Sequence, residues 1–591
     1  DEARELAGIL LHAHGVAAPV DLDELSREAG GHPLFLDELV RHLGSSGDRG
    51  AGALHLEDVV ARRAAALDAR ARDIVELVAV AGHPLYLETF ARAADVPPDS
   101  LGRLISALRV SNLVRSGGVR PSDTIEPYHD RVRDAILAGI DGERRKNLHL
   151  TLAGAIEGSP HPGQESILAF HWDGAGRSDV AARHAAAAGK RAAESLAFDQ
   201  AARAFQWALD LGHRDRAHLY EELGDALGNT GRGAEAADAY LAAAELVGVD
   251  AVALELRRKA AEQLLISGHI DRGLRLITQV LAALGMRLPA TPKRALASLL
   301  FRRARLRVRG IGIDARHESE IAATELTRVD MCWSVATGLA MVDLIRGADF
   351  QTRHLLLALD AGEPTRVAKA LAVEGAFLST QGARSRRRAE KLFAAASAHL
   401  EKTPSAFATA LLLGSECVHA YQGGRWARAL ELARAAERAI REQGSATGVA
   451  WQHDTIHFFL CYSLFYLGQL DELASLTPSL LRAATERGDL YAATNLRVGI
   501  PNAAWLVPDR PAQAAEELGL ALAQWTAHGF HLQHYHHLLG LGQLHLYTGE
   551  AAKGYAALAE RWPALEASLI LRVELVRNEA SLLRARLALL E

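Results

Sequence analysis

Hydrophobic positions recur at helical spacing from the start of the chain. The opening sixteen residues, DEARELAGILLHAHGV, place three aliphatic side chains on one face of a helix. Gly31 and Pro33, in the stretch AGGHPLFLDELVRHL, then form a sharp turn that opens a further helix. A polar, glycine-rich linker follows at residues 45–52. Because the first helix begins without a cap, a strand or a leader, we expect more chain upstream of Asp1.

Three helices and a hairpin are expected after the linker. The spacing of apolar residues predicts helices at 68–81, 86–94 and 99–110, and short β-rich runs predict strands near 113–115 and 125–128. The two strands flank the turn sequence SGGVRPSD, as in a hairpin. This order of elements is that of a winged helix.

A winged helix can read DNA by placing its third helix in the major groove. The third helix expected here, DSLGRLISALRVSN, carries two cations, Arg103 and Arg109. Contacts to phosphate dominate the affinity for DNA, so this helix lacks most of the charge that binding needs. We therefore favour a packing module, and a winged-helix DNA-binding transcriptional regulator remains the alternative.

From Asp179 onward, small and aromatic residues return with a period of 35 to 37 residues. Ala201 and Phe205 of one unit correspond to Ala236 and Tyr240 of the next. Small residues let two helices approach closely and the aromatic ring fills the groove to the next pair, as in tetratricopeptide repeats. The pattern predicts a mainly α fold, in which a helical lid and a small winged-helix module precede a long α-solenoid of tetratricopeptide-like repeats.

The changes of pattern along the chain predict six segments. These are a helical lid of an ATPase module at 1–50, a winged-helix-like domain at 51–145, a helical junction at 146–180, tetratricopeptide repeats at 181–285, a basic irregular insert at 286–320, and tetratricopeptide-like repeats at 321–591.

Composition and charge narrow the classes of partner. Hydrophobic residues make up 49% of the chain and aromatic residues 6%, which favours helices built from Ala, Leu and Val. The formal net charge of −6 gives no reason to expect binding to nucleic acid or to an anionic membrane. The three cysteines lack the CxxC spacing of a zinc site, and no apolar run approaches the roughly 20 residues of a bilayer span. We expect a cytoplasmic protein.

Three stretches, in this order, carry a resemblance to a known class. They are EAGGHPLFLDELVRHL, EPYHDRVRDAIL and ILAFHWDGAG, followed by the repeats. Together they resemble the C-terminal part of bacterial signal-transduction ATPases with numerous domains, the STAND class. The similar proteins are those of the maltose-regulon-activator type and those fused behind Ser/Thr protein kinases.

The resemblance implies a role in nucleotide binding for three residues. Gly31 and Pro33 would lie near the adenine, and His129 would touch the β-phosphate of ADP as a latch of the closed state. The simpler alternative is that His129 and Asp130 cap the helix that begins near Arg131, with Asp130 as the favoured N-cap residue.

The phosphate-binding core of the class is missing from this sequence. No GxxxxGK[ST] motif occurs, so the lysine, the backbone amides and the hydroxyl that hold phosphates and Mg²⁺ are absent. The kinase motifs are absent as well. We expect no catalytic residues, no cofactor bound by this chain alone, and ADP or ATP binding only together with an upstream core. The parent protein would be an ATPase or a Ser/Thr kinase.

The repeats are the expected receiver of a signal, because stacked repeats present a concave surface. Candidate contacts are the arginines at a turn, Arg384, Arg386, Arg387 and Arg388, and the polar or aromatic residues Trp451, Asn495 and Arg497. All of them could instead be solvated or packed. The expected partners are a protein or a small-molecule signal, the upstream ATPase or kinase domain, and further copies of the protein on activation.

Two further clusters invite a functional interpretation. Six histidines lie between His528 and His545, but no HExxH motif occurs, and we favour histidines that line a repeat groove over a metal site. The basic stretch at 287–310 carries eight cations and no acid. It is either a solvated cationic face, which we favour, or an amphipathic helix that docks on an acidic surface through its leucines.

Three functions remain open on these observations. The first is a regulatory and sensing segment of a STAND-type ATPase, in which a signal bound by the repeats releases an ADP-held closed state. The second is the DNA-binding regulator. The third is a protein-interaction scaffold that binds no nucleotide.

Overall fold

The computed structural model describes residues 2–16, 20–45, 55–118, 120, 122–159, 161–248, 251–340, 342–442 and 450–590. Contacts divide the chain into two compact units. The N-terminal unit comprises Asp1–Arg191 and Trp207–His213, and the repeat unit comprises Ala192–Gln206 and Arg214–Glu591. The linker expected at 45–52 lies, apart from Ser45, outside the described residues.

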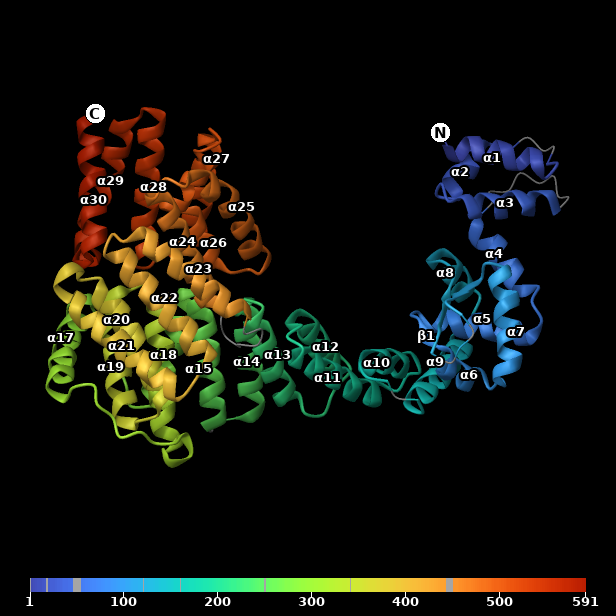
Figure 1. Cartoon of the computed structure of the whole chain (residues 1–591), viewed down its shortest axis with the longest axis horizontal. Helices are drawn as coiled ribbons and strands as arrows, with labels where there is room; N and C mark the ends of the chain where they lie inside the picture. Colours follow the sequence, from blue (N-terminus) through green and yellow to red (C-terminus); the bar gives the residue numbers. More distant parts are fainter. Residues whose placement is uncertain are drawn as a thin grey trace. The chain divides into compact units, whose positions relative to one another are not determined.

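The N-terminal unit is helical around one small sheet (Figure 1). Its elements are α1 (Glu2–Ala13), α2 (Leu22–Glu28), α3 (Pro33–Ser45), α4 (Leu56–Ala65), α5 (Ala69–Ala81), β1 (Leu85–Tyr86), α6 (Leu87–Ala94), α7 (Pro98–Val110), β2 (Val114–Ser116), β3 (Thr124–Pro127), α8 (Asp130–Ala138), α9 (Gly142–Glu157), α10 (Glu165–Gly174) and most of α11 (Ser178–Glu194). One hydrophobic core runs from α1 to α9, so the first helices and the sheet-bearing part are packed together.

The three helices and the two strands of the hairpin appear where the spacing predicts them, within two residues. Two elements were not expected. Helix α4 precedes the three helices, and β1 pairs with β3, giving an antiparallel sheet of order β1-β3-β2. Tyr86 pairs with Thr124 in this sheet, which is why α6 begins one residue later than expected. Residues 119 and 121 of the expected hairpin turn lie outside the described ranges.

The repeat unit is a succession of packed helices, shown from green to red in Figure 1. After α12 (Phe198–Asp210), which the two units share, the helices are α13 (Arg216–Asn229), α14 (Gly233–Val247), α15 (Ala251–Ile266), α16 (Ile270–Ala283), α17 (Pro292–Arg309), α18 (Ala323–Leu339), α19 (Leu344–Ala361), α20 (Pro364–Ser379), α21 (Arg386–Lys402), α22 (Ala406–Gln422), α23 (Trp426–Glu442), α24 (Ala450–Tyr466), α25 (Leu470–Glu486), α26 (Leu490–Arg497), α27 (Pro511–Gln524), α28 (Leu532–Thr548), α29 (Ala551–Ala567) and α30 (Glu574–Leu590). Short 3-10 turns lie at Glu318–Glu320, Gly382–Ser385, Ile500–Trp505 and Ile570–Arg572. The mainly α solenoid is therefore confirmed.

The repeat frame is visible in the contact between α13 and α14. A Cβ placed on Gly224 would lie 2.7 Å from the ring of Tyr240, so the glycine is what lets the ring approach. The Tyr240 hydroxyl donates to Asp225 at 2.6 Å and ties the two helices together. Repeats that are distant in sequence also contact each other: Thr526, just after α27, donates to Asp271 of α16 at 2.9 Å, although 255 residues separate them.

Most of the basic stretch at 287–310 forms α17 (Pro292–Arg309), and two of its arginines are not simply solvated. Arg302 lies 3.1 Å from Asp349, and Arg303 lies 3.2 Å from Glu374. Both acids belong to neighbouring repeat helices and are buried. The favoured interpretation was therefore wrong for these arginines: the helix docks on acidic groups of its own chain. Of the leucines expected to dock, Leu299 and Leu306 are buried, whereas Leu300 is 60% exposed.

Within the described ranges, no helix combines the length and the apolar character that crossing a membrane requires.

Candidate functional site

The structure brings together the two motifs of the N-terminal unit for which the family resemblance implies a role in nucleotide binding. Gly31 has a left-handed backbone with φ +73°, and Pro33 is the first residue of α3. The ring centroid of His129 lies 5.7 Å from that of His32, inside the Gly31–Pro33 turn. It lies 4.9 Å from that of Phe35, on the first turn of α3. Segments about a hundred residues apart therefore meet at one place.

His129 itself is the N-cap of α8. Its Nδ1 accepts the backbone N–H of Arg131 at 3.2 Å. We expected Asp130 in this role, and that was wrong, because Asp130 is already the first helical residue. A ring that accepts at Nδ1 carries its proton on Nε2 when neutral. His129 can therefore cap the helix and still offer Nε2–H to an anion.

Arg131 is the residue that the motif analysis missed. Its Nη2 lies 3.0 Å from Glu28 Oε1 and 2.8 Å from Glu57 Oε1, and its Nη1 donates to the Glu28 carbonyl. Burial alone would lower the pKa of the guanidinium, but Glu57 and Glu28 raise it above its usual value. Arg131 thus ties α2 and α4 to α8, beside His129. Its place in the YHDR sequence was the available signal.

This histidine cluster (His32, Phe35, His129 and Arg131) is half of a nucleotide site at most. Arg131 is committed to two carboxylates, so it has little capacity left for a phosphate. His129 supplies one donor near a glycine turn. A single donor can report the presence of a phosphate group, but it cannot hold a nucleotide without the backbone cradle of a phosphate loop.

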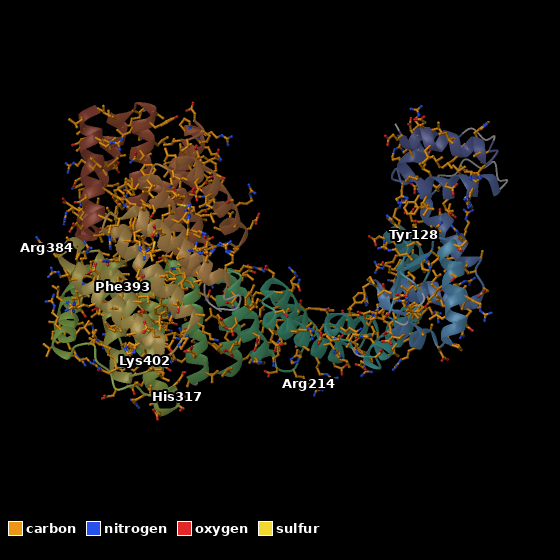
Figure 2. All side chains as sticks on the ribbon, in the orientation of Figure 1. Tyr128, Arg214, His317, Arg384, Phe393 and Lys402 are labelled. Atoms are coloured by element: carbon orange, nitrogen blue, oxygen red, sulfur yellow. The ribbon has the colours of Figure 1, made fainter. Side chains whose placement is uncertain are left out.

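The four arginines predicted as contacts lie at the turn into α21. Figure 2 marks Arg384 at the edge of the repeat unit. Arg384, Arg386 and Arg387 are exposed, and Arg386 donates to Glu390 at 3.0 Å. Burial and neighbouring Arg307 lower the pKa of Arg388, which is half-buried. Contact of this group with a partner stays a prediction.

Of the other three predicted contacts, Asn495 and Arg497 are buried and Trp451 is half-buried. Asn495 is 2% exposed and accepts from Gln533 at 3.2 Å. Arg497 is 8% exposed and donates to Glu517 at 2.9 Å. As buried side chains, these two offer no surface to a protein partner. Trp451 is half-buried and lines a cavity.

The histidines between 528 and 545 are mostly structural. His531 Nδ1 accepts from the Trp525 indole at 3.3 Å, and His534 Nδ1 accepts the His531 N–H at 3.0 Å. Burial lowers the pKa of His536 to about 3 and keeps the ring neutral. Among the described residues, no three of these histidines place ligand atoms within metal-binding reach of one another.

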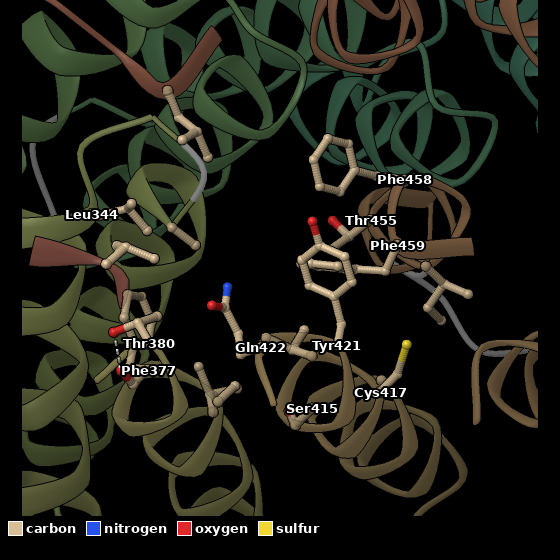
Figure 3. Close-up of a pocket in the computed structure, with 18 of the residues that line it drawn as sticks. Leu344, Phe377, Thr380, Ser415, Cys417, Tyr421, Gln422, Thr455, Phe458 and Phe459 are labelled. Atoms are coloured by element: carbon tan, nitrogen blue, oxygen red, sulfur yellow. Dashed lines mark hydrogen bonds between the residues drawn. The ribbon is translucent and has the colours of Figure 1, made fainter. Parts of the chain in front are cut away.

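An apolar cavity of about 140 Å³ lies inside the repeat unit. Helices α20, α22, α24, α28 and α30 form most of its wall. Figure 3 shows Phe377 on one side of it and Phe458 and Phe459 on the other. Apolar cavities of roughly 150 Å³ bind single-ring molecules such as benzene. This cavity therefore matches a small ligand rather than a peptide.

Two glutamine side chains face this cavity with unused hydrogen-bonding groups. Gln452 is 4% exposed, and neither its Oε1 nor its Nε2 has a hydrogen-bond partner among the described residues. In the same part of the chain, Gln422 Oε1 is buried and likewise unpaired. Figure 3 shows the Gln422 amide pointing into the cavity. Leaving such groups unpaired costs about 1–3 kcal/mol each, which a complementary ligand would recover.

A carboxyl group closes one end of the cavity wall. Glu579 accepts from the hydroxyls of Tyr466 and, at 3.3 Å, Tyr535. Burial raises the pKa of Glu579, and the two tyrosine hydrogen bonds oppose that rise. The wall therefore holds both acceptors and donors in an otherwise apolar lining.

Of the residues singled out from the sequence, Trp451 and His536, one of the six histidines between His528 and His545, line this cavity. The glutamines carried no signal that could have identified them. They come from helices that are about thirty residues apart in sequence, and nothing in a helical repeat pattern says which polar side chain faces inward.

The comparisons with known proteins add little to this geometry. No family model and no curated protein matches the chain. Among solved structures, it is similar to a signal transduction ATPase with numerous domains that has a tetratricopeptide repeat sensor, from Pyrococcus horikoshii. The two share 11% identity, the alignment covers 98% of this chain and 74% of that chain, and the TM-score is 0.35. At that level the likeness carries no functional argument.

Proposed function

We propose that this chain is the regulatory and sensing segment of a STAND-type signalling ATPase. The repeat unit binds a small-molecule signal in its apolar cavity. The N-terminal unit contributes His129 to an ADP-held closed state of a core supplied by the parent protein. The observation that carries the proposal is the cavity with the unpaired amide of Gln452 buried at its wall.

The ligand that this cavity fits is a largely apolar molecule of about one ring with one hydrogen-bonding group. The phenyl rings of Phe377, Phe458 and Phe459 suit an apolar or aromatic body. The amide of Gln452 can both donate and accept. A buried polar group discriminates against a ligand that leaves it unpaired, because the lost hydrogen bond is not replaced by water.

Phenol and toluene form a matched pair of probes for the cavity. They have nearly the same size, and only phenol carries a hydroxyl. We expect the full chain to bind phenol more tightly than toluene, by about 5- to 10-fold for one hydrogen bond of about 1 kcal/mol. Isothermal titration calorimetry, or the shift of the melting temperature, measures this.

Gly414→Leu tests where the probe binds. Gly414 lines the cavity, and a Cβ there would meet Ile456 at an ordinary 3.7 Å, so a side chain can begin at this position, and we expect that of leucine to occupy the cavity. We expect binding to be lost. The control is Gly519→Leu on α27, where a Cβ meets no atom of the described chain within 4 Å. Equal binding in both variants would reject the cavity as the signal site.

The nucleotide part of the proposal needs a longer protein that includes the ATPase core. His129→Asn keeps a favoured N-cap residue and removes the imidazole. If His129 contacts the β-phosphate, ADP binding should weaken by about 5- to 150-fold, with a smaller effect on ATP. Unchanged ADP affinity would leave His129 with its capping role alone.

The alternative function, that of a DNA-binding regulator, can be tested simply. A DNA-binding regulator would show an affinity for random duplex DNA that falls steeply with salt. The exposed cations of α7 are still Arg103 and Arg109, so nothing in the structure favours that function. The upstream ATPase or kinase domain, oligomerisation on activation and a cytoplasmic location stay predictions.

A further inference from the structure

A second group of side chains in the repeat unit has the chemistry of a ligand site. Glu437 of α23 and His453 and His457 of α24 place a carboxylate oxygen and two imidazole nitrogens within 4.8 Å of one another. Two histidines and one carboxylate form a common three-ligand set for Zn²⁺, with a fourth position left open. We propose that these three residues bind Zn²⁺. The inference is independent of the proposed signalling function.

The spacing supports the site from the backbone upward. His453 and His457 are one helical turn apart in HDTIH, so they share a face of α24. Their ring centroids are 4.0 Å apart, and His457 Nε2 lies 3.6 Å from Glu437 Oε1. Zinc bonds to nitrogen and oxygen are about 2.0–2.2 Å long, so two ligand atoms of one ion lie at most about 4.4 Å apart. The 3.6 Å between His457 and Glu437 is within this limit, and small side-chain rotations bring the whole group, whose ligand atoms lie within 4.8 Å, to zinc-binding distances.

Glu437 is the anionic member of the group, and its carboxylate can be released to a metal ion. Glu437 now pairs with Arg441 at 2.9 Å, but the Arg441 side chain is 70% exposed and is free to turn into solvent.

The surroundings indicate a clamp rather than a hydrolytic centre. Asp454 follows the first histidine, where a metalloprotease motif carries its glutamate base. Here Asp454 lies 3.1 Å from Arg487, which holds it toward α25. A metal would therefore tie α23 to α24. Gln452 and Ile456, which directly precede the two histidines on α24, line the cavity, so the clamp would fix one wall of it.

The test uses the full, untagged chain, freed of metal with a chelator and titrated with Zn²⁺ in a calorimeter. We expect one site that does not bind Mg²⁺, because imidazole prefers Zn²⁺ and similar transition metals. Glu437→Gln preserves shape and removes the anionic ligand. His453→Phe keeps ring volume and removes a nitrogen. Each should weaken Zn²⁺ binding by more than about 100-fold, since even outer partners of ligands contribute 10- to 100-fold.

The matched control is His55→Asn in the other group of close ligand atoms, formed by Glu28, His55 and Glu57. We expect it to leave Zn²⁺ affinity unchanged. Hydrogen exchange of α24 should slow when Zn²⁺ is added to the wild type and to His55→Asn, and not in Glu437→Gln. Wild-type affinity in both site variants, or loss of the site in His55→Asn, would overturn the proposal.

Discussion

The two units hold their charged side chains in different ways. In the N-terminal unit, Arg131 joins α2 and α4 to α8, and its side chain remains 31% exposed. In the repeat unit, Arg303 joins α17 to α20 with 9% exposure, and its partner Glu374 is fully buried. Water screens the first network and hardly reaches the second. The comparison indicates that the first contact can open at modest cost, whereas the second is a fixed part of the core.

The two units also need opposite properties: the histidine cluster needs a contact that a ligand can break, and the cavity of the repeat unit needs a wall that stays formed. A two-state element needs interactions weak enough for a ligand to reverse, in the range of a few kcal/mol. The histidine cluster, with its partly exposed ion pairs, falls in that range. The cavity needs the opposite property, because a preformed site binds without first ordering its wall.

The largest effect is expected at the buried pair. Arg303→Ala leaves the Glu374 carboxyl without its cationic partner, although Thr352 still donates to it, and we expect the free energy of unfolding of the repeat unit to fall by about 3–5 kcal/mol. Hydrogen exchange of α17 and α20 measures the loss. The control is Arg305→Ala, whose side chain is 58% exposed and 3.6 Å from Asp360, with an expected loss below about 1 kcal/mol. Similar losses in both variants would contradict the contrast.

The second-largest effect on stability is expected at a pair of buried histidines in the N-terminal unit, when the pH is lowered. His149 and His171 share a 3.0 Å contact between their Nδ1 atoms. Burial lowers the pKa of His149 to about 4 and that of His171 to about 2. Below pH 6.5 the two histidines bind protons in the unfolded chain but not in the folded one. Their contribution to the free energy of unfolding is therefore complete above pH 6.5 and is lost as the pH falls toward 4.

From pH 7 to 5.5 the two histidines should together lower the free energy of unfolding by about 2.5 kcal/mol. This is below the limit of about 1.4 kcal/mol per pH unit for each group, because that limit is reached only well below the unfolded pKa of about 6.5. Hydrogen exchange of α9 and α10 at the two pH values measures the loss. His171→Leu removes one of the two protons and should reduce the loss by about half. An unchanged pH dependence in that variant would show that other groups are responsible.

The smallest effect is expected at Arg131. Arg131→Ala removes charge-assisted hydrogen bonds that are partly solvated, and we expect a loss of about 1–2 kcal/mol. Because α2 and α4 lose their tie to α8, amides of α1–α3 should exchange faster while those of α17 and α20 stay unchanged. Arg103→Ala, on the exposed face of α7, is the control. A loss as large as that of Arg303→Ala would remove the distinction between the two networks.

Local chemistry explains which parts of the fold were predictable. Helices α5, α6 and α7 follow from the spacing of apolar residues, and the hairpin follows from β-rich runs on both sides of a turn. The approach of Tyr240 to Gly224 follows from the repeat period. The pairing of β1 with β3 was not predictable, because β1 has two residues and its partner lies about forty residues away.

The candidate sites were also predictable only in part from the sequence. The family resemblance assigned His129 and the Gly31–Pro33 turn to the same site. Only the tertiary structure shows that His129 contacts His32 in that turn. The HDTIH spacing was present in the sequence, but only the packing of α23 on α24 supplied Glu437 as a third ligand.

Helical periodicity in this protein determined which residues are inside, and tertiary structure decided what each buried polar residue meets. The period identifies the inward face of α16, where Ile270, Ile277 and Leu281 recur at helical spacing and are buried, because burial of apolar surface depends on local spacing. The partner of Arg303, and the lack of one for Gln452 among the described residues, depend on how helices distant in sequence cross. Hydrogen bonds and ion pairs act over a few ångströms and require specific geometry, so their pairing is set by the packed structure rather than by the pattern.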